Sequence, residues 1–152
     1  MLFKTHLIVP IVLILLFLNK IPNLLIFIPI FLFASILPDI DNKFSKLGKK
    51  KISRIFNFFM KHRGILHSFT FVFIIGILLF FYFREIFYPF VLGYSVHLIL
   101  DCFTKTGVRI FYPLKFKIKG FVRTGGIFEK IIFIFLFLLC LFLVFYRIFV
   151  VL

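Results

Sequence analysis

Negative charge is scarce in this chain. Its 152 residues include five Asp and Glu residues against 19 Lys and Arg residues, which gives a formal net charge of +14. A strongly basic protein often binds nucleic acid, but here most basic residues lie in two segments between long apolar runs. This distribution is typical of the cytoplasmic loops of a membrane protein, which contact anionic headgroups. We therefore expect membrane lipids as partners and no nucleic acid.

Cysteine is also rare, and a signal-peptide cleavage site is missing. The two cysteines, Cys102 and Cys140, lie in or beside apolar runs without a CxxC motif, so we expect no disulfide framework. The apolar N-terminal segment is not followed by an A-x-A sequence. We expect this segment to be retained as part of the protein.

Apolar residues, by contrast, are in excess. They make up 63% of the chain, whereas a soluble domain usually contains about 45–50%. One small core cannot bury this excess, so lipid is the natural solvent. Five apolar runs cover residues 6–18, 24–37, 65–83, 87–103 and 127–150. The sequence predicts an all-α fold: one integral-membrane domain over residues 1–152, a polytopic helix bundle with four to five transmembrane helices. The first two runs are short for the roughly 20 residues that a span needs, so whether they cross fully stays open.

The basic residues predict the orientation. Five crossings would place Lys4, Lys130 and the segments 42–63 and 105–123 on one side, and only Lys20, Arg84 and Arg147 on the other. Because cytoplasmic loops carry the excess of Lys and Arg, we expect the N-terminus and both basic loops in the cytoplasm. The expected location is the cytoplasmic (inner) membrane.

Acidic residues and histidines gather near the cytoplasmic ends of these predicted spans. Except for Glu85, at the opposite end, they would all reach a similar membrane depth. His97 and Asp101 are an i,i+4 pair on one helix face. Ionisable side chains within a membrane are costly and are usually functional. The candidate metal ligands are His6, Asp39, Asp41, His62, His67, His97 and Asp101.

Imidazole and carboxylate ligands together favour Zn, Mn or Fe over Ca²⁺, which prefers oxygen alone. A divalent metal ion lowers the pKa of a bound water and makes it a nucleophile. Asp39, Asp41 and Asp101 are the candidate catalytic carboxylates, one of them as general base. Arg63 and Ser68, in the stretch HRGILHS, are candidates for substrate binding, with a membrane anchor and a helix cap as their respective alternatives. Glu129 and Thr104 are expected to support the ligands without binding the metal.

Four stretches in this order resemble the LexA-regulated, membrane-bound, metal-dependent hydrolase family (YdjM-like). They are Thr5-His6, P-D-I-D at 38–41, H-R-G-I-L-H-S at 62–68, and the G-Y-x-x-H-L-x-x-D-x-x-T-x-x-G pattern at 93–107. The resemblance covers nearly the whole chain and implies a multi-span inner-membrane protein with metal-dependent hydrolase activity. The sequence departs from the family at Asn42, where His is expected, and at Leu66, where Thr is common. The absence of His at position 42 would imply a different contact to the metal ligands, or a different metal ion.

Three functions are consistent with the polar cluster. A hydrolase acting at headgroup depth is expected to take a phosphoester or a lipid headgroup as substrate. A cation or proton transporter would spread its ionisable residues across the bilayer, whereas this chain gathers them on one side. In a structural membrane protein, the same residues would form hydrogen bonds that hold the helices together.

Overall fold

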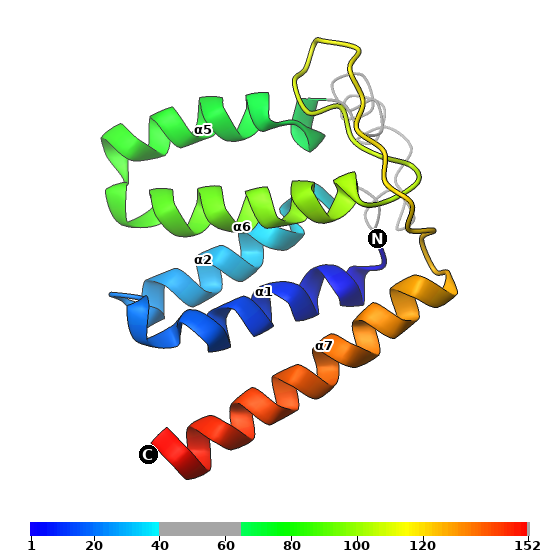
Figure 1. Ribbon diagram of the computed structural model, residues 1–152. Coiled ribbons are helices and arrows are strands. Elements are labelled where there is room, and N and C mark those ends of the chain that lie inside the picture. Colours follow the sequence, from blue (N-terminus) through cyan, green and yellow to red (C-terminus); the bar gives the residue numbers. More distant parts are fainter. Residues whose placement is uncertain (40–64, 152) are drawn as a thin grey trace, which may run out of the picture.

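Five α-helices make up the described part of the fold, a computed structural model that covers residues 1–39 and 65–151 (Figure 1). The prediction of an all-α fold is confirmed. The helices are α1 (Phe3–Phe17), α2 (Leu24–Ile36), α5 (Phe69–Tyr82), α6 (Arg84–Cys102) and α7 (Ile127–Tyr146), which continues into a π-helical turn at Arg147–Val151.

The helices pack in a spatial order that differs from their order in the chain. α6 lies between α5 and α2, α2 packs on α1, and α1 packs on α7. Gly93 of α6 meets α2 so closely that a Cβ there would collide with the Phe31 carbonyl oxygen and crowd Ala34. Small residues permit such close approach between helices in membranes. Because this contact is tight, the α6 face carrying His97 is held at a defined place against the end of α2.

Local signals explain where two of the helices begin. Asn23 and Ser68 cap α2 and α5, and each side-chain oxygen accepts a hydrogen bond from the backbone N–H three residues later, both over 3.4 Å. α2 ends at Ile36 and passes into a 3₁₀ turn, Leu37–Asp39. Pro38 disfavours continued α-helix at Leu37. This turn carries Asp39 out of the helix and towards the end of the bundle.

Several predicted boundaries were wrong. The fourth apolar run was predicted to begin at residue 87, but α6 already begins at Arg84 and only Phe83 separates it from α5. Glu85 in the first turn is favoured by the helix dipole, which offsets the turn signal. The predicted run 65–83 includes His67 near its start. His67 lies before α5, in the 3₁₀ turn Ile65–His67, because the Ser68 cap delays the helix to Phe69.

The connection from α6 to α7 consists of turns, bends and irregular residues without a named strand. Two isolated β-bridges fold it back on itself, Thr104 with Val122 in parallel and Val108 with Ile118 in antiparallel pairing. Gly107 has a φ of +61° at this fold, a conformation that residues with a Cβ rarely adopt. The loop thus covers the end of the bundle where the predicted site residues lie.

Among the described residues, two helical stretches are long and apolar enough to cross a membrane, Phe3–Lys20 and Ile127–Phe149. α2 with its 3₁₀ turn (Leu24–Asp39) and α5 are apolar but shorter. The 14 residues of α5 rise about 21 Å at 1.5 Å per residue, against a hydrocarbon thickness of about 30 Å. In α7, Glu129 is the one buried side chain, and the side of this helix that faces away from α1 is free to face lipid.

Candidate metal centre

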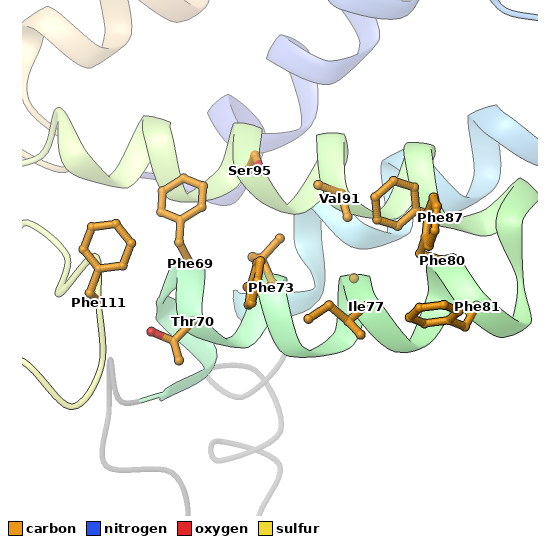
Figure 2. A pocket seen from close by; sticks show the side chains of 12 residues that line it. Phe69, Thr70, Phe73, Ile77, Phe80, Phe81, Phe87, Val91, Ser95 and Phe111 are labelled. Atoms are coloured by element: carbon orange, nitrogen blue, oxygen red, sulfur yellow. The ribbon is translucent and has the colours of Figure 1, made fainter.

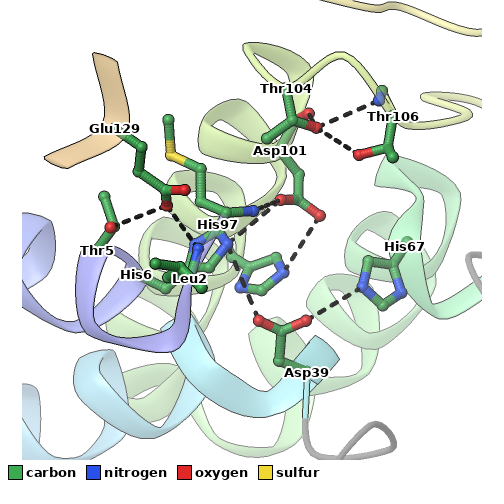
Figure 3. A network of polar contacts seen from close by, with 12 residues as sticks. Leu2, Thr5, His6, Asp39, His67, His97, Asp101, Thr104, Thr106 and Glu129 are labelled. Atoms are coloured by element: carbon green, nitrogen blue, oxygen red, sulfur yellow. Dashed lines mark hydrogen bonds and ion pairs between the residues drawn. The ribbon is translucent and has the colours of Figure 1, made fainter. Parts of the chain in front are cut away.

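Five of the predicted ligands meet at one end of the bundle (Figure 3). They come from α1, from the turn after α2, from the turn before α5, and from the last two turns of α6. The residues are His6, Asp39, His67, His97 and Asp101. Three elements that are remote in sequence from α6 thus deliver imidazoles and a carboxylate to its buried His97–Asp101 face.

The Nε2 atoms of the three histidines all lie near the two carboxylates. His6 Nε2 is 3.3 Å from Asp101 Oδ1 and 3.9 Å from Asp39 Oδ2. His67 Nε2 is 4.0 Å from Asp39 Oδ1, and His97 Nε2 is 3.9 Å from Asp101 Oδ2. Most of these separations are too long for hydrogen bonds. The separations between these ligand atoms are instead close to the value of about 3.4 Å expected for ligand atoms placed tetrahedrally around Zn²⁺ at about 2.1 Å from it.

His97 is held by a backbone carbonyl. Its Nδ1 lies 2.8 Å from the Ser35 carbonyl oxygen. Because a carbonyl oxygen can only accept a hydrogen bond, Nδ1 is the donor. The proton is therefore on Nδ1, and the lone pair is on Nε2, which points into the cluster (Figure 3). Histidines that bind metals usually donate their other ring N–H in this way, which sets the tautomer and the ring orientation.

Three ring nitrogens in the cluster lack a partner. Within the described residues, His6 Nδ1, His6 Nε2 and His97 Nε2 are buried and make no hydrogen bond. Leaving a buried polar group unsatisfied costs about 1–3 kcal/mol. His6 and His97 also stack with ring centroids 4.1 Å apart and nearly parallel rings. Two adjacent, buried imidazoles with unused lone pairs fit a divalent cation, which accepts electron pairs without supplying a hydrogen bond.

The ligand atoms form two overlapping groups, His6–Asp39–His97 and His67–His97–Asp101, each with atoms within 4.8 Å of one another. His97 belongs to both, yet Ser35 already uses its Nδ1. One imidazole lone pair binds one cation, so His97 serves a single ion. The geometry fits one ion shared by both groups, or a second ion held without His97.

The cluster already contains one positive charge. The amino group of Met1 donates to Asp101 Oδ1 over 2.8 Å, and the Asp101 side chain is only 2% exposed. An ion pair this deeply buried compensates the charge of a carboxylate that would otherwise be very costly. Asp39 is 21% exposed and has no such ammonium partner among the described residues. It is therefore the more accessible of the two carboxylates.

Glu129 links the first helix to the last. Its Oε1 accepts from the backbone N–H of Leu2 and from the Thr5 hydroxyl at 3.0 Å, and its Oε2 accepts from Gly125 N–H at 2.6 Å (Figure 3). These bonds secure the α1 turn that carries His6. Glu129 lies outside both groups of ligand atoms, and its supporting role stays a prediction.

Thr104 and Ser68 form local caps. The Thr104 hydroxyl donates to the Asp101 carbonyl over 2.7 Å and closes the end of α6. Ser68 is fully buried; its hydroxyl donates to the Ile65 carbonyl and accepts from Phe71 N–H, which fixes the turn carrying His67. The role of Ser68 in substrate binding stays a prediction. Asp41, His62 and Arg63 lie outside the described residues.

Two supporting groups were not expected from the sequence. One is the Ser35 carbonyl, for which no side-chain signal exists. The other is Tyr94, whose hydroxyl donates to the Leu66 carbonyl over 2.7 Å and ties α6 to the His67 turn. Tyr94 lies three residues before His97 and so on a neighbouring part of the same helix face. That spacing was the one signal that could have identified it.

Replacement of Glu129 by Ala should loosen this end of the bundle. Two backbone N–H groups and one hydroxyl lose their acceptor, and we expect the free energy of unfolding in detergent to fall by about 2–4 kcal/mol. Glu85→Ala, an exposed glutamate at the other end, should change it by less than about 0.5 kcal/mol. Equal effects in denaturant titrations of the two variants would contradict the assigned role of Glu129.

Comparison with known proteins places the chain in a family. The family model described as "YdjM inner membrane protein" matches residues 1–151. The chain is also 28% identical over 105 residues to a Bacillus subtilis (strain 168) relative described as "Uncharacterized protein YvsG", covering 65% of this chain and 66% of the relative. No solved structure matches. The resemblance seen in the sequence is thereby confirmed at the level of the family: the chain belongs to the YdjM inner membrane protein family.

Proposed function

We propose that the protein is a membrane-embedded, metal-dependent hydrolase with its site at the cytoplasmic interface, acting on a phosphoester or lipid headgroup. The observation that carries this proposal is the set of buried ring nitrogens of His6 and His97 that make no hydrogen bond although they lie beside Asp39 and Asp101. A cluster serving only to hold helices together would pair these nitrogens, because leaving them unsatisfied destabilises the fold.

A divalent ion bound there would act as a Lewis acid and lower the pKa of water. In hydrolysis of a phosphoester, the oxygen of water bonds to phosphorus, the bond from phosphorus to the alcohol oxygen breaks, and a proton passes from water to the leaving alcohol. We assign Asp39 as the group that accepts the proton of water, since it is the more exposed carboxylate and contacts His67. Asp101, held by the Met1 amino group, stays a ligand.

The membrane orientation is part of the proposal. The end of the bundle with the cluster also carries Lys4, Lys130 and the loop 105–123, whereas Lys20 and Arg147 lie at the other end. By the excess of positive charge in cytoplasmic loops, the site faces the cytoplasm. Four or five helices then cross or enter the bilayer, with the shorter helices accommodated by local thinning.

Metal analysis is the direct test. Detergent-purified protein is expected to contain about one to two equivalents of Zn, Mn or Fe by elemental analysis. Removal with a chelator should lower the thermal unfolding midpoint and abolish hydrolysis of bis(p-nitrophenyl) phosphate or phospholipid micelles, and the added metal should restore both. The control Glu85→Gln should keep its metal. Protein that folds equally well with and without chelator, and never contains metal, would refute the proposal.

A further inference from the structure

A groove of about 550 Å³ runs between α5 and α6 on the outer side of the bundle (Figure 2). Its volume is in the range of small-molecule sites. The walls are almost wholly apolar, with Phe73, Ile77, Phe87 and Val91 along its length. Thr70 and Ser95 contribute the only hydroxyls among its lining residues. The groove therefore suits a flexible hydrocarbon and offers little to a polar ligand.

One end of the groove adjoins the metal centre. Phe69 and Thr70 line this end and follow His67 and Ser68 directly in the chain. The backbone N–H of Phe69 donates to the Ile110 carbonyl over 2.8 Å, and the Thr70 hydroxyl donates to the Tyr112 carbonyl over 2.9 Å. These bonds hold the loop against the groove and place Phe111 in its lining (Figure 2).

The loop that closes this end is strongly basic. Between Cys102 and Gly126 it contains six Lys and Arg residues and no acidic residue: Lys105, Arg109, Lys115, Lys117, Lys119 and Arg123. Arg109 directly precedes the residue that bonds Phe69. Basic clusters at a membrane surface attract anionic headgroups. An apolar groove that ends under a basic loop has the charge pattern of a phospholipid: a hydrocarbon tail and a negative phosphate.

We propose that the α5–α6 groove binds one acyl chain of an anionic phospholipid, with the phosphate among the basic side chains of the 105–123 loop, next to His67 and Asp39. This would make anionic phospholipids the substrate class of the proposed hydrolase, and that assignment rests on the proposed function. Binding of the chain itself needs no turnover and can be measured separately. The acyl chain selects lipid over free phosphate, and the loop selects anionic over zwitterionic lipid.

The chain contains no tryptophan, so a single introduced indole is an unambiguous fluorophore. Phe87→Trp places it in the groove, and Phe135→Trp places a control on the exposed surface of α7. Phosphatidylglycerol with brominated acyl chains is titrated into the detergent-solubilised full chain. Quenching of the indole in Phe87→Trp should saturate near one lipid per protein, whereas quenching in Phe135→Trp should rise in proportion to the lipid in the micelle. Brominated phosphatidylcholine should bind the Phe87→Trp protein at least fivefold more weakly.

Filling the groove provides the second arm. Val91→Phe, and independently Ser95→Leu, should weaken the saturable quenching of the Phe87→Trp protein at least fivefold while circular dichroism stays unchanged. Parallel, unsaturated quenching of both indole variants overturns the proposal, as does unchanged affinity in a folded, filled variant. Metal content is measured on the same samples. Metal without saturable quenching refutes the groove alone, and saturable quenching without metal refutes the hydrolase alone.

Discussion

His97→Ala should empty the metal centre. His97 belongs to both ligand groups, so its loss breaks each of them. Structural zinc sites with four ligands have apparent binding free energies of about 10–16 kcal/mol, or about 3 kcal/mol per ligand, which corresponds to a more than hundredfold weaker Kd. We expect the purified variant to contain less than a tenth of the metal of the unmodified protein, and its metal-dependent hydrolysis to vanish.

The matched control is Tyr88→Ala. It also truncates an aromatic ring on α6, but at an exposed position near the opposite end of the helix. Both variants are compared by elemental analysis, and circular dichroism establishes that each is folded. Retention of full metal content in folded His97→Ala would rule out the assigned ligand set.

Asp39→Asn should abolish turnover more than binding. The amide has nearly the shape of the carboxylate and can still offer one oxygen to a cation, but it cannot accept a proton. General-base catalysis contributes about 10²–10⁴ in rate, and we expect kcat to fall by a factor in this range. Metal content should fall by much less than in His97→Ala, since the amide keeps an oxygen donor and Asp39 belongs to only one of the two ligand groups.

The pH profile separates this role from a purely structural one. If Asp39 accepts the proton, the acid limb of the pH–rate profile should disappear in Asp39→Asn at saturating metal. Asp101→Asn serves as the comparison, because that residue is proposed as a ligand and not as a base. A profile that keeps its acid limb, with kcat reduced less than tenfold, would assign Asp39 to metal binding alone.

The site was more predictable from the sequence than the helix boundaries were. Acidic and imidazole side chains are so rare in this apolar chain that their placement at helix ends pointed to one depth of the membrane. The His97–Asp101 pair followed from helical spacing alone. Asp39 followed from its place among the few acidic residues at the cytoplasmic ends of the predicted spans. These inferences rest on local geometry and on the cost of burying charge.

Other features depended on tertiary contacts that leave no local mark. The order of packing, with α6 between α2 and α5, requires knowing that Gly93 lies on Phe31. The Ser35 carbonyl that orients His97 is backbone and has no residue signature. The start of α6 at Arg84 was missed because charged residues beside a Pro resemble a turn, while an acidic residue early in a helix also favours its beginning.

The bond network of Glu129 has a consequence for biosynthesis. His6 is translated among the first residues and Glu129 more than a hundred residues later, yet the turn around His6 gains two of its hydrogen bonds when Glu129 accepts from Leu2 and Thr5. His6 is therefore synthesised long before Glu129, which stabilises the turn around it. A nascent chain that ends after α6 contains all five residues of the cluster, but the turn around His6 gains its bonds to Glu129 only after the start of α7 has been made.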